Sequence, residues 1–562
     1  MSSSYPVPSC AVSVSGGEAG FPGGLMVAVP TGLLVTPLRS GRPLAEEDRS
    51  ALAVGGTERI RSGDLVVFCK VVAVAPAQVK RDGRVRAKGS PVHHATLGPL
   101  EEWLDAKAGP GVIDGVAGRA PLDPRFVKGE RERLLARAFM VRVLVLLTLM
   151  PEAGIRDAVI ALAGDLALVP WARPWRPASD RALGDWRSAL GPGPLEELRD
   201  AVLGSAWREH QGPGGPVAAI GRSRPLKAGA IDGTLIRVPD TPANRRAYGS
   251  VGTGDDSSPF PQVRALPMTC CADRSLLAMP HGPAGGDKAA AEQALLDEAM
   301  ERFPGLFSPG WVWLMDRNYH GAARIARMIA RTHVLIRLKS DIPLKRTSQV
   351  LPDGSYRAEL SGDGVTVRVR VIEYFADVEG QEVPEMFCLV TDLMDYEEYP
   401  APELAALYKW RWDGSETALR ETKAPLRGAG PGTGPMLRSG SPDLVRQELA
   451  AWAAAVEMTR GVTRDAALAA TPAGKGRRAG LAIRPRDLSL ARAIRAVIAA
   501  IRSGRACYDA VAREIAGRRV TVDRDRHRAR KSKSPSGFGH ATAKDTVTRI
   551  ATAIITMANT PA

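Results

Sequence analysis

The feature that most constrains this chain is the stretch 408–423, which reads Tyr-Lys-Trp-Arg-Trp-Asp-Gly-Ser-Glu-Thr-Ala-Leu-Arg-Glu-Thr-Lys. Glu416 and Lys423 stand seven residues apart, two turns of an α-helix, so both side chains project from one side. Two earlier aspartates, Asp232 and Asp316, follow apolar runs that indicate strands. Three carboxylates that a fold brings together suit a two-metal site for phosphoryl transfer.

The two aspartates could instead have a structural role, without binding a metal ion. Aspartate at the end of a strand is often a turn residue or a helix cap, so Asp232 and Asp316 alone favour that reading. The presence of Glu416 and Lys423 on one helical face favours a catalytic role instead. A fold that uses all three acids must pack the helix 408–423 against the ends of the two strands.

Composition favours a nucleic acid as partner. The chain has 562 residues, enough for two to four domains, and 76 Lys and Arg against 61 Asp and Glu, a net charge of +15. Such an excess suits a polyanion, although a genome that prefers arginine codons would give the same balance. The six cysteines show no Cys-x-x-Cys spacing, which argues against a zinc module and a disulfide framework and fits a reducing cytoplasm. No signal-peptide pattern is visible, and the apolar run 138–150 predicts a buried helix.

The pattern changes divide the chain into five regions. They are a Gly/Pro-rich extension at 1–95, either β or disordered; a helical region at 96–215; a mixed α/β core at 222–430 with a β insertion at about 340–400; a helical region at 431–515; and a basic tail at 516–562. For the first helical region two interpretations stay open, DNA binding or a plain bundle. Its segment 177–190 predicts a helix with Ser179 as N-cap and with Arg181 and Arg187 exposed.

Within the core the periodicity predicts a mixed sheet. We expect one strand over 227–239, with Asp232 and Thr234 on one face, and further strands at 263–266, 276–280, 311–316 and 334–338. Helices are expected at 287–303 and 321–333. In the insertion, the alternating valines from Val365 to Val371 predict a half-buried strand whose other face carries Arg368 and Arg370. Ser441-Pro442 opens a later helix.

Three segments together resemble the DDE transposases of bacterial insertion sequences, in the group with a Tyr-Arg-Glu-Lys signature (the IS-four family). The signature positions are Tyr408, Arg411, Glu416 and Lys423. Residues 231–234 (Ile-Asp-Gly-Thr), followed by 240–244, resemble the family's first-aspartate segment, and 314–319 (Leu-Met-Asp-Arg-Asn-Tyr) resembles the second. The resemblance covers about residues 130–460.

One departure from the signature concerns spacing. Four residues, not three, separate Arg411 from Glu416. On an uninterrupted helix this turns the two side chains about 140° apart instead of about 40°. Gly414-Ser415 indicates either a bulge or a helix that begins again with Ser415 as cap. Glu421 is a fallback acid, but two residues from Lys423 it faces elsewhere.

The resemblance implies an RNase H-like core with the β insertion, and Asp232, Asp316 and Glu416 as ligands of two Mg²⁺ or Mn²⁺ ions. It implies that Tyr408, Arg411 and Lys423 contact DNA phosphate. Trp410 and Trp412 would stack on a base or pack in the core.

The implied reaction is cleavage at transposon ends followed by strand transfer. The implied partners are double-stranded DNA, as terminal inverted repeats and target, and a second copy on paired ends, with no membrane, in the bacterial cytoplasm near the nucleoid. A nuclease without strand transfer and an inactive DNA-binding repressor relic stay open as alternatives.

Overall fold

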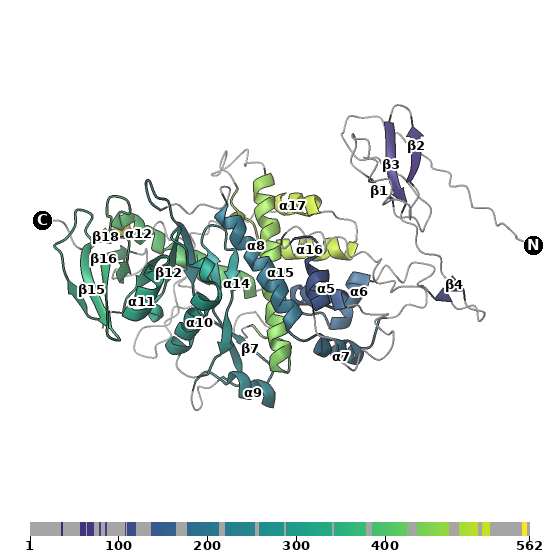
Figure 1. Ribbon diagram of the computed structural model, residues 1–562, viewed down its shortest axis with the longest axis horizontal. Coiled ribbons are helices and arrows are strands. Elements are labelled where there is room, and N and C mark those ends of the chain that lie inside the picture. The colour runs from purple at the N-terminus through teal and green to yellow at the C-terminus, as the bar shows by residue number, and fades with distance from the viewer. Residues whose placement is uncertain are drawn as a thin grey trace, which may run out of the picture. The chain divides into compact units, whose positions relative to one another are not determined.

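The computed structural model describes residues 109–119, 137–163, 177–212, 220–252, 258–285, 288–339, 342–377, 385–423, 435–470, 483–503, 508–517 and 554–558, the single residues 107 and 426, and five short strands between 35 and 86 (Figure 1). The chain forms two compact units. One contains residues 1–93 and 165–176, and the other contains 94–164 and 177–562. The basic stretch 518–533 of the tail lies outside the described residues.

The first unit carries a small antiparallel sheet. Its strands β1 (Val35–Pro37), β3 (Leu65–Val71) and β2 (Thr57–Ser62) pair in that order, and β4 (Gln78–Val79) pairs with β5 (Val85–Arg86). Of the two interpretations for residues 1–95, these strands favour the β-rich one.

The second unit is built on a sheet whose first five strands lie in the order β10-β9-β6-β12-β13. These strands are β6 (Lys227–Ile231), β9 (Met268–Cys270), β10 (Leu276–Ala278), β12 (Trp311–Met315) and β13 (His333–Arg337). The β10-β9-β6 pairs are antiparallel, and the β6-β12-β13 pairs are parallel. This is the strand arrangement of an RNase H-like core, which confirms the predicted fold class.

Helices cover both faces of this sheet. Trp311, Trp313 and Met315 of β12 face the cluster that contains side chains of α10 (Lys288–Arg302) and α11 (Ala322–Ile329). Val312 and Leu314 face the other cluster, which α12 (Ala401–Tyr408) completes. Because β12 is buried on both sides, it is a continuous apolar run, as central parallel strands are.

The β insertion extends the same sheet. From β13 the order continues β17 (Glu385–Thr391), β16 (Val365–Asp377), β15 (Tyr356–Gly362) and β14 (Leu344–Arg346), all antiparallel. The C-terminal strand β18 (Ile554–Met557) also pairs with β16. The predicted valine alternation holds, but Arg370 is fully buried and donates to Asp353 and to the carbonyls of Leu393 and Tyr399.

The single strand expected over 227–239 is wrong in one respect. The chain leaves the main sheet after β6 and resumes as β7 (Thr234–Arg237) in a second sheet, β11-β8-β7, with β8 (Gln262–Ala265) and β11 (His281–Pro283). The break falls at Asp232-Gly233. A Cβ atom at Gly233 would clash with the Glu292 carboxylate, so the bend packs closely against α10.

The helices at either end of the sequence pack together. α15 (Pro442–Ala469) begins at Ser441 as expected and is buried almost all round; α8 (Gly193–Gln211) and α5 (Arg137–Leu149) lie alongside it (Figure 1). The remaining described helices in these regions are α3 (Val112–Arg119), α6 (Ile155–Ala163), α7 (Asp180–Leu190), α16 (Leu490–Ser503) and α17 (Tyr508–Gly517). No helix in the described ranges combines the length and apolar character that crossing a membrane requires.

Two predictions for α7 have different outcomes. Ser179 caps the helix as expected, since its hydroxyl accepts from the Ala182 backbone N–H. The expected exposure of Arg187 is wrong: its side chain is 11% exposed, donates to Gln447 and Ser439, and pairs with Glu448. Packing of α7 against α15 decides this orientation.

Candidate active site

Asp232 and Asp316 lie side by side at one edge of the sheet. In the parallel ladder between β6 and β12, Ile231 is opposite Met315, so the residue after each is an aspartate at the same level. Adjacent strands are about 4.8 Å apart. The side chain of Asp232 is 19% exposed. The fold therefore places two carboxylates as neighbours where their strands end.

Asp316 also has a capping function. It is the N-cap of the 3₁₀ helix η6 (Arg317–Tyr319), and its Oδ1 accepts from the Asn318 backbone N–H at 2.8 Å. The alternative reading from the sequence, a capping aspartate, is thus correct for one oxygen. The cap fixes the orientation of the carboxylate, which a metal ligand also requires.

Tyr408 ties α12 to the end of β12. Its hydroxyl donates to the Met315 carbonyl at 3.0 Å, one residue before Asp316, and the residue is 2% exposed. Burial raises the pKa of Tyr408 to about 12. The implied contact of Tyr408 with phosphate needs correction, because the side chain is enclosed and its hydroxyl already has an acceptor.

Arg411, on α13 (Trp410–Trp412), lies among the three acids. Its Nη1 is 3.4 Å from Asp232 Oδ2, and the residue is 7% exposed. Burial lowers the pKa of Arg411, but Tyr408 and the carboxylates of Asp232, Asp316 and Glu416 more than offset this, and the net pKa lies above its ordinary value. One cation therefore experiences all three predicted acids at once.

Glu416 reaches this group because the helix contains a π-helical turn. Residues Asp413–Thr417 form the π-helix η7 between α13 and α14 (Ala418–Lys423). A π turn takes up one extra residue, so the bulge predicted from Gly414-Ser415 is confirmed. The alternative, a helix capped by Ser415, is wrong, since the Ser415 hydroxyl donates to the Arg411 carbonyl within a continuous helix.

The π turn fits closely against the sheet. Thr269 of β9 donates its hydroxyl to the Gly414 carbonyl. A Cβ atom at Gly414 would lie 2.7 Å from Cys271 Sγ, so only glycine allows this approach. Glu416, within the turn, is exposed.

Lys423 is the last residue of α14 and is half-buried. Burial lowers its pKa, and Asp232 opposes that shift. Glu421 faces away and pairs with Arg274 at 3.0 Å, which removes it as a fallback acid. The intact Glu–Lys spacing agrees with the electrostatic effect of Asp232 on Lys423.

The residues at this site fit divalent cations. Carboxylate oxygens are the ligands that Mg²⁺ prefers, and three elements each contribute one carboxylate around a single cationic group. The buried hydroxyl of Tyr319 has no hydrogen-bond partner among the described residues, and its pKa is raised by burial and by Glu292, Asp232 and Asp316. A polar atom left in this condition beside two of the acids is suited to a hydrated ion.

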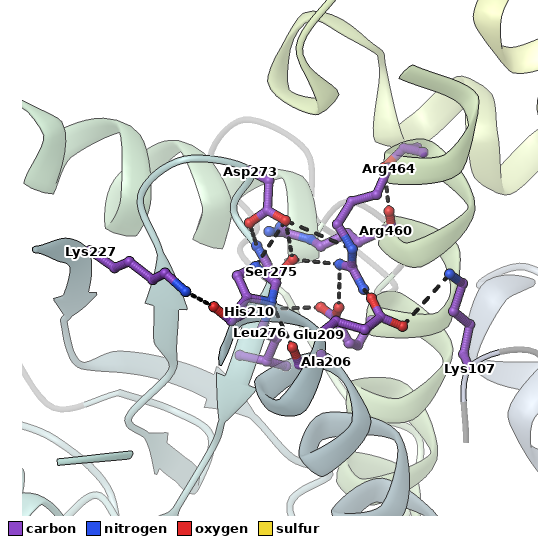
Figure 2. A network of polar contacts seen from close by, with 12 residues as sticks. Lys107, Ala206, Glu209, His210, Lys227, Asp273, Ser275, Leu276, Arg460 and Arg464 are labelled. Carbon is purple, nitrogen blue, oxygen red and sulfur yellow. Dashed lines mark hydrogen bonds and ion pairs between the residues drawn. The ribbon is translucent and has the colours of Figure 1, made fainter. Parts of the chain in front are cut away.

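A second group with metal-ligating side chains is better explained as an ion pair. The ligand atoms of His210, Cys270 and Asp273 lie within 4.8 Å of one another. However, His210 Nδ1 is 2.6 Å from the Ala206 carbonyl, and Nε2 is 3.0 Å from Asp273 Oδ2 (Figure 2). Both partners are acceptors, so both ring nitrogens carry protons and no lone pair faces a metal.

Electrostatics agree with this interpretation. Burial lowers the pKa of His210, but Asp273 overcomes it, and the net pKa lies well above the usual range. Burial raises the pKa of Asp273, but His210 and Arg464 overcome it in the opposite direction. The sequence contained no signal for this pair, because its members lie on α8 and on the β9–β10 turn, 63 residues apart.

Sequence reasoning also missed Glu292, which lies beside the site. It is 1% exposed and pairs with Arg264 at 3.0 Å. Helical periodicity places Glu292 on the same face as Leu295 and Leu296, so only its charge argued for a position at the surface. Its burial is accompanied by the ion pair with Arg264 and by the close contact with the bend at Gly233. The two tryptophans contact cations: Arg486 lies 5.1 Å from the Trp410 ring and Arg411 lies 5.1 Å from the Trp412 ring.

Strand order and acid placement together define a class of protein, the RNase H-like cores that carry two acids on adjacent strand ends and a third on a later helix. Residues 223–429 match a family model described as "Transposase DDE domain". The transposase InsG for insertion sequence element IS4 of Escherichia coli (strain K12) is 26% identical over 239 residues, which cover 39% of this chain and 48% of that protein. Residues 223–429 are accordingly similar to the DDE domains of transposases, including a transposase of the IS4 type.

The chain spans about half the length of this curated relative. Among solved structures, a piggyBac transposase synaptic complex with hairpin DNA is 10% identical, with a TM-score of 0.36, and the match covers 76% of this chain and 83% of that one. The match to the DDE family implies the use of divalent metal ions.

Proposed function

We propose that this protein is a DNA transposase that cuts at the ends of its own element and joins the freed ends to target DNA. The observation that carries the proposal is the convergence of Asp232, Asp316 and Glu416 on Arg411. Similarity of residues 223–429 to transposase domains supports the same reaction class.

In this proposal Asp232, Asp316 and Glu416 hold two Mg²⁺ ions, with Mn²⁺ as a substitute. Bound ions would activate the attacking water or 3′-hydroxyl and stabilise charge on the leaving oxygen. Tyr408 orients the end of β12 and thereby Asp316. Lys423 supplies a positive charge toward the scissile phosphate from its place near Asp232.

Arg411 has a different role from the phosphate contact implied by the signature. In the described state its guanidinium balances the negative charge of the acids. Like charges this close would repel one another without a cation between them. Arg411 therefore keeps the group assembled until divalent ions and phosphate arrive.

The partner in this proposal is double-stranded DNA, both as terminal inverted repeats and as target. The net charge of +15 favours a polyanion. Paired ends require two copies of the chain, so we propose a homodimer on DNA, in the bacterial cytoplasm near the nucleoid. The regions 96–215 and 431–515 are proposed as helical regions flanking the core at 222–430, the first of them binding DNA.

An Mg²⁺-dependent cleavage assay on DNA that carries the element's ends tests this function. Asp232→Asn and Glu416→Gln should each lower the cleavage rate by about 1,000-fold, since loss of a metal ligand removes several kcal/mol of charge stabilisation. Glu403→Gln, an exposed acid on α12, is the matched control and should leave the rate unchanged. Cleavage without joining would indicate a nuclease, and end binding without cleavage a repressor.

Asp316→Asn separates the two functions of that residue. Asparagine caps a helix about as well as aspartate, so the cap at η6 should survive and the melting temperature should stay within a few degrees. Cleavage should still be lost, because an amide is a poor ligand for Mg²⁺. Full activity in Asp316→Asn would show that this residue is a cap and no more.

A further inference from the structure

Helix α14 carries Lys423 and is the last part of the continuous helix that contains the π turn with Glu416. It has six residues and begins directly after that π turn. The π turn interrupts the regular α-helical hydrogen bonds before it, and the last carbonyls of a helix have no partner within it. The orientation of both side chains therefore depends on what holds α14 from outside.

Two side chains of α15 donate hydrogen bonds to α14. Arg460 Nη2 donates to the Ala418 carbonyl at 3.0 Å and to Thr422 Oγ1 at 2.7 Å. Trp452 Nε1 donates to the Thr422 carbonyl at 3.0 Å. These bonds fall on the turn from Ala418 to Thr422, which lies between Glu416 and Lys423 in the chain.

Burying the Arg460 guanidinium costs free energy, which a purely structural role would not require. It is 3% exposed, and burial lowers its pKa, although Glu421 and Glu457 oppose the shift. Its Nε and Nη1 have no hydrogen-bond partner among the described residues. A buried cation with unpaired groups destabilises a fold unless its remaining bonds are valuable. The hydrogen bonds that its guanidinium does make both go to α14.

The neighbouring turn of α15 is fixed to the rest of the molecule. Arg464 donates to Glu457 at 2.7 Å, to Glu209 of α8 at 2.9 Å and to the Ser275 hydroxyl (Figure 2). The Leu276 backbone N–H donates to Glu457 at 2.6 Å. Since α15 is tied to α8 and to the β9–β10 turn, it offers Arg460 a rigid base.

We propose that Arg460 is a positioning residue for the active site: by gripping the Ala418–Thr422 turn it sets the direction in which Glu416 and Lys423 face Asp232. The inference rests on the proposed function. It adds that the helix following the matched domain decides how accurately the third acid is placed. Arg460 touches neither the acids nor DNA in this account and acts only through α14.

The test compares Arg460→Met with Arg460→Lys in the full chain. With Met, amide exchange at 418–423 should accelerate by about tenfold, the effect of a lost charged hydrogen bond. Cleavage should slow by about 100-fold, as expected for a misplaced catalytic group. Affinity for end DNA should change by less than about twofold, since binding and chemistry are separable. Lysine should restore part of the rate, because one ammonium at the Nη2 position can donate to both acceptors.

Arg446→Met is the matched control. It makes the same substitution on α15, at an exposed position that pairs with Glu196 of α8, and should change neither exchange at 418–423 nor cleavage. Thr422→Val, which removes one acceptor with little change of shape, gives a milder version if Arg460→Met does not fold, and should accelerate exchange in the same segment.

Exchange at 418–423 that stays at the wild-type rate in both Arg460→Met and Thr422→Val would overturn the inference. A rise spread evenly over α15 and α14 would also overturn it, because that pattern indicates general loosening. If the wild-type protein cleaves no end DNA, the proposed function fails, and the exchange measurements alone decide whether Arg460 positions α14.

Discussion

At the scale of single residues, the buried charged groups are the side chains whose orientation could not be predicted from the sequence. His210 reads as an ordinary residue near the end of a helix, yet the fold encloses it with Asp273 and Arg464. A histidine that donates from both nitrogens to acceptors stays protonated above its ordinary pKa. The folded protein therefore holds a proton that the unfolded chain releases near neutral pH.

This proton predicts a pH dependence of stability. Because the pKa of His210 is raised on folding, its contribution is complete below about pH 6.5 and is lost as pH rises toward the folded pKa. Over that window the free energy of unfolding should fall by about 1.4 kcal/mol per pH unit. Urea unfolding across neutral and mildly alkaline pH measures the slope.

His210→Gln is the comparison for this measurement. Glutamine cannot carry the extra proton, so the variant should be less stable at pH 6 but should have a flatter slope. If the free energy of unfolding has the same slope against pH in both proteins, the buried histidine is neutral. That result would contradict the ion-pair interpretation.

At the scale of elements, the π turn explains how an altered signature keeps its geometry. The extra residue between Arg411 and Glu416 is absorbed over Asp413–Thr417, and the hydroxyl of Ser415 donates to the Arg411 carbonyl within the turn. Glycine at position 414 allows the turn to approach Cys271. The bulge could be predicted from the residues, whereas its contact with β9 could not.

Deletion of Ser415 tests this element. The shortened segment should close into a regular α-helix, since the one extra residue that the π turn takes up is removed, and Glu416 should keep its side of the helix. End cleavage should stay within about tenfold of wild type. Insertion of one alanine after Ser415 should instead turn α14 by about another 100° and abolish cleavage. Equal loss in both variants would contradict the assignment of the bulge.

At the scale of the whole molecule, several residues that stabilise the region 223–429 lie outside it. Trp311 of β12 packs against Trp207 of α8, with 4.9 Å between ring centroids. Asp273 forms ion pairs with His210 and Arg464, and the Thr422 carbonyl accepts a hydrogen bond from Trp452. The sheet, α8 and α15 therefore share one packed interior.

We expect residues 223–429 expressed alone to lack a cooperative unfolding transition. Removing the partners of a buried charge costs about 3–5 kcal/mol, a large part of the roughly 5–15 kcal/mol that stabilises a domain. Near-ultraviolet circular dichroism and urea unfolding, with residues 94–562 as the control, measure the difference. A sharp transition with a full m-value in the short chain would show that the matched region folds independently.

The sequence by itself determined most of the elements that form and named the residues proposed to carry the chemistry. The apolar run 311–315, the capping residues Ser179 and Ser441, and the spacing from Glu416 to Lys423 are local patterns, and local patterns set backbone propensity and the face on which a side chain lies. These patterns predicted a mixed α/β core, and the resemblance to DDE transposases added the RNase H-like fold and the three acids, which stay a proposal as the site.

Only the tertiary structure decided where the long strand breaks, that Tyr408, Arg187 and Arg370 point inward, and that Arg460 grips the helix beside the site. Each of these depends on a partner distant in the chain. Burial of a polar group is favourable only when that partner is present, and a single local segment contains no information about it.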